Sequence, residues 1–210
     1  MLRIGITQRV VARPDRGERW DALDQSWTCL LARLGAFAVP LANRVENPDS
    51  LIDALGLHGV ILSGGNDLAC LPNPENPAPE RDMFERNLIA VCADRTLPLL
   101  GVCRGMQMIL ATGGMLPVQV SGHVGSSHPI TPAENCPLPL ASRAVVNSFH
   151  NYGFYVQSIK GDFSAAALAE DGTVEAVYHR QLPIWGVMWH PEKGPTDEDD
   201  DVLIRALFGL

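Results

Sequence analysis

Leu99-Leu100-Gly101-Val102-Cys103-Arg104-Gly105 is the most informative segment of the chain. Its first residues belong to an apolar run over residues 97–102, which is typical of a buried strand. An apolar helical pattern follows over residues 106–112. A strand that turns this sharply into a helix passes through a strained backbone conformation, and glycines on both sides relieve the crowding. The segment therefore predicts a strand, a tight turn at Cys103 and a helix.

Cys103 is the candidate nucleophile. The side chain at the apex of such a turn points into solvent above the sheet. It also lies at a helix N-terminus, where the dipole and the free N–H groups favour a thiolate, and where the Arg104 N–H could receive an oxyanion. A small buried hydrophobic residue is the alternative for any free cysteine. The other cysteines lack this context and are assigned to that alternative: Cys29, Cys70, Cys92 and Cys136.

His190 and Glu192 are the candidates for the base and for the group that orients it, because a thiolate nucleophile needs both. They follow the apolar segment 184–189. In an extended chain residues i and i+2 point to the same side, so Glu192 could hold one ring nitrogen of His190 while the other serves Cys103. The His190-Pro191-Glu192 triplet alone is weak evidence, and the cysteine turn in the same chain gives it weight.

A glycine-rich loop, Ser63-Gly64-Gly65-Asn66-Asp67, follows the buried-type strand at residues 59–62. Such a loop could turn a second backbone N–H towards the site and complete an oxyanion hole. A plain turn at the end of a strand is the alternative. Its spacing is neither that of a Walker loop nor that of a dinucleotide fingerprint, so no nucleotide cradle is expected here.

Short apolar segments alternate with helical patterns in the first half, which predicts an α/β layered sheet with a mostly parallel centre. The second half is more extended, with Asp171-Gly172 as a hairpin turn. Asp82 and Arg86 are spaced for an i,i+4 pair. No repeat or linker divides the chain, so a single domain over residues 1–210 is expected. The predicted strands are 2–7, 37–41, 59–62, 97–102, 144–146, 165–169, 174–178 and 184–189, and the predicted helices are 24–34, 48–55, 79–93, 106–112 and 198–207.

Composition excludes several classes of partner. The 210 residues carry a formal net charge of −8, which opposes binding to nucleic acid or to an anionic membrane surface. No apolar segment approaches the roughly 20 residues that cross a bilayer, and the N-terminus lacks a signal-peptide core. Five cysteines without a C-x-x-C pair make a poor disulfide framework. The cytoplasm is the expected location.

No cofactor and no metal are expected from the motifs. His123 and His128 flank a Gly-Ser loop, but no cysteine or carboxylate stands near them at ligand spacing. The chain also has no H-E-x-x-H motif. Metal catalysis is therefore not expected.

Three blocks around Cys103, His190 and Gly65 resemble the signature blocks of class I glutamine amidotransferase-like proteins: Gly101-Val102-Cys103-Arg104-Gly105-Met106-Gln107, Trp189-His190-Pro191-Glu192 and Leu62-Ser63-Gly64-Gly65-Asn66-Asp67. Within that superfamily the chain is most similar to the γ-glutamyl-γ-aminobutyrate hydrolase family, because it also contains Gly5-Ile6-Thr7, Arg81-Asp82 with Glu85, and Val146-Asn147-Ser148-Phe149-His150. The resemblance covers nearly the whole chain. It implies a flavodoxin-like three-layer sandwich and a Cys-His-Glu triad that hydrolyses a γ-glutamyl amide through a thioester.

The resemblance also implies roles for single residues. Cys103 attacks the γ-carbonyl, His190 transfers the proton and Glu192 orients His190. The N–H groups of Gly65 and Arg104 hold the oxyanion. The side chains expected at the γ-glutamyl group are Gln107, Asn147, Ser148, His150 and Asn151. For the segment 147–153, an ordinary polar turn is the alternative.

The segment 9–25 resembles short family members found with surface-polysaccharide pathways. Some of those relatives are thought to remove glutamate from a γ-glutamyl nucleotide phosphoramidate. If the loop borders the pocket, its arginines could meet phosphates: Arg9, Arg13, Arg16 and Arg19. The alternative is a solvated loop balanced by Asp15 and Glu18.

Three functions are compatible with these residues. The first is a free-standing hydrolase that releases glutamate from a small γ-glutamyl amine or phosphoramidate. The second is a glutaminase subunit that delivers ammonia to a synthetase on another chain. The third is a non-catalytic binding relative, against which the presence of all three triad residues argues. A homodimer is left open.

Overall fold

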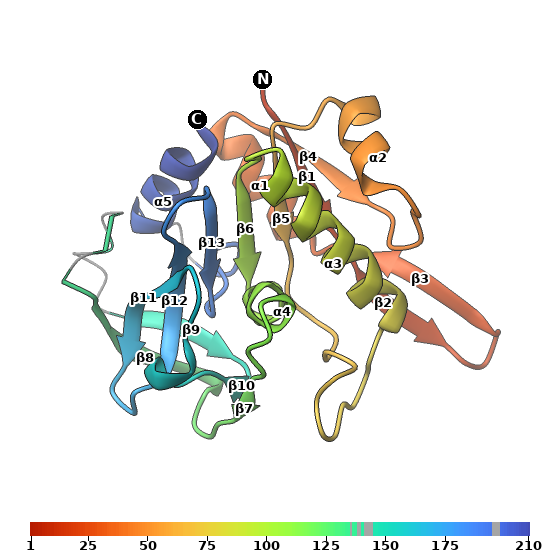
Figure 1. Ribbon diagram of the computed structural model, residues 1–210. Helices are drawn as coiled ribbons and strands as arrows, with labels where there is room; N and C mark the ends of the chain where they lie inside the picture. The colour runs from red at the N-terminus through yellow and green to blue at the C-terminus, as the bar shows by residue number, and fades with distance from the viewer. Residues whose placement is uncertain (135, 138–139, 141–144, 195–197) are drawn as a thin grey trace.

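A computed structural model of the chain describes residues 1–134, 136–137, 140, 145–194 and 198–210. Within this part, a nine-stranded sheet has the order β4-β1-β5-β6-β13-β12-β11-β8-β9 (Figure 1). Its first five strands are parallel: β4 (Phe37–Leu41), β1 (Arg3–Thr7), β5 (Gly59–Leu62), β6 (Leu99–Val102) and β13 (Ile184–Val187). The sheet continues with antiparallel neighbours: β12 (Val174–His179), β11 (Phe163–Ala169), β8 (Val124–Pro132) and β9 (Val145–Phe149).

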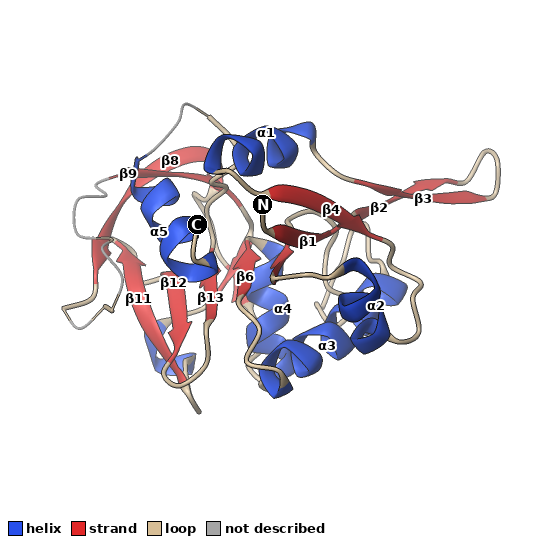
Figure 2. Cartoon of the chain, turned by 90° about the horizontal axis from the view of Figure 1, so that it is seen from above, coloured by secondary structure: helices blue, strands red, loops and turns tan. Residues whose placement is uncertain are grey.

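Helices cover both faces of the sheet (Figure 2). One face carries α1 (Gln25–Leu34) and α5 (Glu198–Phe208), and the other carries α2 (Pro48–Leu55), α3 (Pro79–Asp94) and α4 (Arg104–Thr112). Because strand side chains alternate between the faces, β5 and β6 contribute to both cores. Ile61 and Leu100 pack towards α1 and α5, whereas Val60 and Leu99 pack towards α2 and α3.

This arrangement confirms the predicted three-layer α/β sandwich with a mostly parallel centre. The order β4-β1-β5-β6 is the 2-1-3-4 order of flavodoxin-like sheets, which confirms that part of the prediction as well. The single-domain organisation stays a prediction.

Capping residues set the predicted helix boundaries. Asp24 accepts a hydrogen bond of 3.0 Å from the Ser26 N–H at the start of α1, and Gly35 ends that helix with a φ of 86°. Asn47 accepts one of 3.1 Å from the Ser50 N–H at the start of α2. These short-range signals explain why the boundaries of α1 and α2 were predictable.

The segment after β1 differs from the predicted loop. It forms a hairpin of β2 (Arg9–Arg13) and β3 (Glu18–Ala22) that projects from the body of the molecule (Figure 2). Most of its side chains are exposed, so no apolar alternation in the sequence indicates these strands. Strand β8, the short ribbon of β7 (Val118–Gln119) and β10 (Tyr152–Gly153), and the 3-10 helix η1 (Val156–Ser158) were not predicted either.

Six predicted strands have different limits; β1 and β6 begin one and two residues later than predicted, β11 begins two residues earlier and β12 ends one residue later. The strand at residues 144–146 extends to Phe149 as β9, and Ala144 lies outside the described residues. The strand predicted at residues 184–189 ends at Val187. In the described part of the chain, none of the helices combines the length and the apolar character that crossing a membrane requires.

The turn between β6 and α4 is as crowded as its glycines predict. Cys103 has φ 53° and ψ −108°, values that L residues rarely adopt. A Cβ at Gly101 would lie 2.6 Å from the backbone carbonyl carbon of Gly105, and a Cβ at Gly105 would lie 2.1 Å from the carbonyl oxygen of Leu62. Only glycine therefore allows α4 to begin against the backbone of β5.

We expect Gly105→Ala to lower the free energy of unfolding by at least about 3 kcal/mol, because backbone must move to admit the methyl group. Gly113→Ala is the matched control at the other end of α4. Gly113 has a φ of −80°, and its added Cβ would meet the flexible end of Met115 at 3.0 Å, so the change should stay within about 1 kcal/mol. Urea unfolding followed by circular dichroism measures both. Equal losses in the two variants would contradict the crowding argument.

Candidate active site

The site lies where three neighbouring parallel strands end. Strands β5, β6 and β13 are adjacent in the sheet. Parallel strands end at the same edge, and ligands bind at that edge in open α/β sheets. The loop that begins at Ser63 follows β5, Cys103 follows β6, and His190 comes shortly after β13. The topology thus collects residues that are far apart in sequence.

Cys103 and His190 meet above Gly64. A Cβ at Gly64 would lie 2.7 Å from His190 Cε1 and 3.6 Å from Cys103 Cβ. The side chains of Cys103 and His190 thus lie against the same glycine, and His190 Nδ1 lies 2.7 Å from Glu192 Oε1. All three side chains are buried. The structure therefore brings together the three residues expected to form the triad.

His190 is held as a cation between these two partners. Burial by itself lowers the pKa of His190, because a buried cation loses its hydration. The hydrogen bonds to Cys103 and Glu192, together with the negative charges of both, outweigh burial and raise the pKa of His190 to about 9. A thiolate paired with an imidazolium is a reactive form of cysteine.

Asn147 fixes the main chain at His190. Its Oδ1 accepts a hydrogen bond of 2.8 Å from the His190 N–H, and its Nδ2 donates to the carbonyls of His190 (2.9 Å) and Lys193 (3.1 Å). The ring of Phe149 packs edge-on against the imidazole, with the ring centroids 5.6 Å apart. These contacts orient His190 towards Cys103. Whether Asn147 also contacts substrate stays a prediction.

A pocket of about 170 Å³ opens beside Cys103. Of the residues expected to bind substrate, Gln107, His150 and Asn151 line this pocket. Ser148 lies outside the lining; it is fully buried and donates its hydroxyl to the carbonyl oxygen of His123 at 2.7 Å.

One carbonyl oxygen holds two of the pocket side chains. The carbonyl of Tyr152 accepts hydrogen bonds from Gln107 Nε2 at 2.9 Å and from His150 Nδ1 at 3.1 Å. Gly65 and Arg104, the residues expected to form the oxyanion hole, line the same pocket. The pocket is thus bordered by Gly65 and Arg104 as well as by these polar side chains.

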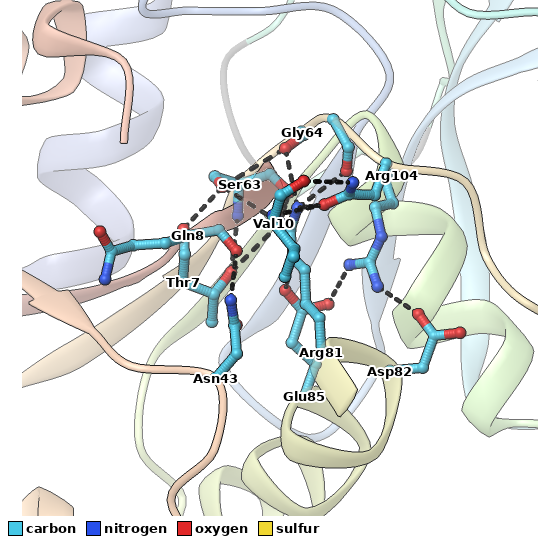
Figure 3. A network of polar contacts seen from close by, with 12 residues as sticks. Thr7, Gln8, Val10, Asn43, Ser63, Gly64, Arg81, Asp82, Glu85 and Arg104 are labelled. Carbon is cyan, nitrogen blue, oxygen red and sulfur yellow. Dashed lines mark hydrogen bonds and ion pairs between the residues drawn. The ribbon is translucent and has the colours of Figure 1, made fainter. Parts of the chain in front are cut away.

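A buried network of charges contacts the loop after β5 and the first residue of α4, both of which border the pocket (Figure 3). The Glu85 carboxylate pairs with Arg81 Nε at 2.8 Å and with Arg104, and Arg104 also pairs with Asp82. Arg81 is fully buried and donates to the carbonyls of Ser63 (2.6 Å) and of the two glycines that follow it. The network therefore joins α3, the loop after β5 and the first residue of α4.

The predicted i,i+4 pair of Asp82 with Arg86 is wrong. Asp82 pairs with Arg104, which α4 brings next to α3. The i,i+4 ion pair of this helix is Arg81 with Glu85, two residues that stood out in the sequence only for their family resemblance. Because buried charges require partners, an Arg-Glu spacing among the apolar residues of α3 is a signal that could have revealed the network.

Mutual charge determines the ionisation of the network. Burial, followed by the charge of Arg104, lowers the pKa of Arg81 to about 10. Burial would raise the pKa of Glu85, but the charges of Arg104 and Arg81 outweigh burial and lower it. Glu85 is therefore ionised at neutral pH.

Only one of the four arginines expected near the pocket is beside the glycine-rich loop. The Arg9 guanidinium lies over Gly65, where a Cβ would be 3.0 Å from its carbon. The base of β2 is tied to this loop, because Asn66 exchanges two hydrogen bonds, of 2.8 and 3.0 Å, with the backbone of Val10.

The other three arginines have partners elsewhere. Arg13 and Arg16 lie 3.3 and 3.8 Å from Asp15, and Arg19 pairs with Glu80 at 2.6 Å. The balanced, solvated alternative thus describes Arg13 and Arg16, and contact with the loop beside the pocket is left to Arg9. The hairpin, which was not predicted, separates these side chains.

Comparison with known proteins agrees with this architecture. A model of the peptidase C26 family matches residues 4–192. The gamma-glutamyl-CDP-amidate hydrolase of Campylobacter jejuni is 35% identical over 196 residues, which cover 90% of each chain. The carbamoyl phosphate synthase small chain of Thermus thermophilus is 29% identical over 181 residues, which cover 85% of this chain and 41% of that relative.

A solved structure of a GMP synthase component from Thermoplasma acidophilum superposes with a TM-score of 0.71 at 24% identity. The superposition covers 100% of this chain and 93% of the other, and shows a common fold. The fold is that of the class I glutamine amidotransferase-like proteins. Within that class, the chain belongs to the peptidase C26 family, as the resemblance implied.

We expect Glu85→Gln to lower the free energy of unfolding by about 3–5 kcal/mol, because two buried guanidinium groups lose their shared counter-charge. Glu80→Gln on the same helix removes an exposed ion pair and should cost less than about 1 kcal/mol. The pKa of Glu85 is lowered in the folded state, so its contribution is present above the unfolded pKa and lost as pH falls. Urea unfolding at neutral and acidic pH tests this. A Glu85→Gln protein as stable as Glu80→Gln at neutral pH would contradict it.

Proposed function

We propose that this protein is a cysteine-dependent hydrolase that cleaves a γ-glutamyl amide and releases glutamate. The observation that carries this proposal is the position of the His190 imidazole, which lies beside Cys103 over Gly64 and 2.7 Å from Glu192 Oε1. The 35% identity to gamma-glutamyl-CDP-amidate hydrolase, over 90% of both chains, supports a γ-glutamyl nucleotide phosphoramidate as the substrate class. A cytoplasmic location and a homodimer remain predictions.

The reaction proceeds in two steps of acyl transfer. The Cys103 thiolate attacks the γ-carbonyl carbon, and the His190 imidazolium protonates the nitrogen that leaves. Water then attacks the thioester while His190 takes its proton, and glutamate is released. Glu192 keeps the imidazole oriented and stabilises its charged form.

The two oxyanion donors are positioned by the backbone. Arg104 is the first residue of α4, so its N–H has no acceptor within the helix. The carbonyl of Gly64 accepts from Arg81 at 3.2 Å. The C=O and N–H of a trans peptide point in opposite directions, so this bond turns the Gly65 N–H away from Arg81. Both residues line the pocket beside Cys103, where a tetrahedral oxyanion would form.

The remaining pocket residues would bind the two ends of the substrate. Gln107 and Asn151 are polar and suit the γ-glutamyl group, whereas His150 forms part of the pocket wall and its Nδ1 is hydrogen-bonded to the Tyr152 carbonyl. Arg9 lies over Gly65 on the side of the hairpin. Within the described residues Arg9 has no ion pair, so its charge is available to a phosphate of the leaving group.

The direct test is a panel of γ-glutamyl substrates assayed for released glutamate. The panel contains glutamine, γ-glutamyl-γ-aminobutyrate, other γ-glutamyl amines and a γ-glutamyl nucleotide phosphoramidate. We expect the phosphoramidate to have the highest kcat/KM and Cys103→Ala to abolish turnover of every substrate. A preference for glutamine, with a turnover that rises when a synthetase is added, would support the glutaminase alternative. The similarity to the carbamoyl phosphate synthase small chain supports that alternative less than the hydrolase relative supports the proposal. Retained turnover in Cys103→Ala would contradict the mechanism.

Arg9→Met tests whether Arg9 contacts a phosphate of the leaving group. We expect it to raise the KM of the phosphoramidate at least about tenfold, because a charge-assisted contact to phosphate is lost. The KM of γ-glutamyl-γ-aminobutyrate should not change. Arg16→Met, at the exposed end of the hairpin, should change neither value.

The pH profile tests the role assigned to His190. Since its pKa is raised to about 9, kcat/KM should decline as pH rises through that value and the imidazolium is lost. Glu192→Gln removes a carboxylate that raises this pKa, so its alkaline decline should begin at least about one pH unit lower. Glu80→Gln should keep the wild-type profile. If the alkaline decline of kcat/KM begins at the same pH in Glu192→Gln as in the wild type, the role proposed for Glu192 at His190 is excluded.

A further inference from the structure

A cluster of three histidines and a glutamate lies on the antiparallel side of the sheet. His123 precedes β8, His128 is within β8, His150 follows β9, and Glu175 is on β12. One nitrogen or oxygen atom from each residue lies within 4.8 Å of those of the other three. His123 and His128 were not expected to bind a metal, because no carboxylate stands near them in the chain. The fold supplies one from a distant strand.

The distances in the cluster match the space around a single ion. His123 Nδ1 lies 3.2 Å from His128 Nε2 and 3.5 Å from Glu175 Oε1. The same oxygen is 3.8 Å from His128 Nε2 and 3.4 Å from His150 Nε2. Ligand atoms at about 2.0–2.2 Å from a tetrahedral zinc ion lie about 3.3–3.5 Å from one another.

The second nitrogen of each ring is already engaged by an oxygen outside the cluster. Asp171 Oδ2 lies 2.9 Å from His123 Nε2, and the Pro129 carbonyl lies 3.3 Å from His128 Nδ1. The Tyr152 carbonyl lies 3.1 Å from His150 Nδ1. These oxygens only accept, so each outer nitrogen carries a hydrogen, and the inner nitrogen of each ring is the one that can bind a metal ion. Metal-binding histidines are oriented in this way.

Within the described part of the chain, two of the four side chains, Glu175 and His150, have inward atoms without a hydrogen-bond partner. Among the residues that the structure describes, neither oxygen of Glu175 has a hydrogen-bond partner, and the same holds for Nε2 of His150, although both side chains are almost completely buried. A buried carboxyl group without a hydrogen-bond donor is costly, so the geometry favours a cation at the centre of the cluster. A metal ion is such a cation, and a protonated histidine is the alternative.

We propose that His123, His128, His150 and Glu175 bind one zinc ion. Imidazole nitrogens and a carboxylate oxygen are ligands typical of zinc, and four protein ligands make a closed, structural site. The two positive charges of the ion are balanced by Glu175 and by Asp171, which contacts His123 from outside. This site is separate from the triad, and the inference does not depend on the proposed hydrolase activity.

The proposed ion would stabilise one wall of the pocket. It joins β8 and β12 to the turn that carries His150. His150 lines the pocket, and it shares the Tyr152 carbonyl with Gln107. Binding of zinc would therefore fix the part of the pocket wall that His150 forms.

The test measures zinc binding by the full chain. Cys103→Ser is used as the background, because Cys103 and His190 could themselves bind zinc. Protein dialysed against a chelator is titrated with zinc sulfate in competition with a chromophoric chelator. We expect one zinc ion per chain. Adding His128→Asn should weaken binding at least about 100-fold, whereas adding His58→Asn, an exposed histidine outside the cluster, should not change it.

A second variant keeps the test decisive if His128→Asn does not fold. Asp171→Asn retains all four ligands and should weaken zinc binding about 10–100-fold. Cobalt(II) in place of zinc should give the intense visible absorption of a tetrahedral site. If Cys103→Ser binds no zinc, or if His128→Asn and Asp171→Asn bind it as tightly as the background, the cluster is a protonated histidine network and the proposal is overturned.

Discussion

The contact between Gly105 and the Leu62 carbonyl is the constraint on which the site depends. It allows α4 to begin directly against β5, so that the N-terminus of the helix and the glycine-rich loop border the same pocket. The strained conformation of Cys103 follows from this close packing, because the chain must reverse within one residue. A larger residue at position 105 would move Cys103 and the start of α4 away from the glycine-rich loop.

The charges behind the pocket act on backbone atoms as well as on each other. Arg81 donates to consecutive carbonyls of the loop after β5, and Glu85 keeps Arg81 and Arg104 together in a region without solvent. Such a network is weak evidence for stability, because burying charges is costly. It does supply orientation, since a loop of glycines has little conformational preference of its own.

The sequence predicted those features that residues close together in the chain determine. Asp24, Gly35 and Asn47 set helix ends through neighbouring atoms, and Gly101 and Gly105 marked the tight turn before its geometry was known. Strand order explains why His190 could be paired with Cys103: both follow parallel strands that end at one edge.

Contacts between distant segments could not be predicted in the same way. Asp82 was given a partner on its own helix, whereas its partner comes from α4. The prediction that His123 and His128 bind no metal rested on local spacing in the sequence, whereas Glu175 approaches them from another strand. In both cases the decisive contact is made by tertiary packing, which leaves no periodic pattern in the chain. The β2–β3 hairpin was not predicted for a different reason, because its exposed strands show no apolar alternation.

The anchoring of the hairpin has an evolutionary consequence. Asn66 fastens the base of β2 beside the pocket, while the turn of the hairpin extends into solvent. Insertions or deletions at that distal turn would leave the catalytic machinery in place. Relatives could thus change which molecules they bind by changing the length and sequence of the hairpin, while the residues beside its anchored end keep their positions.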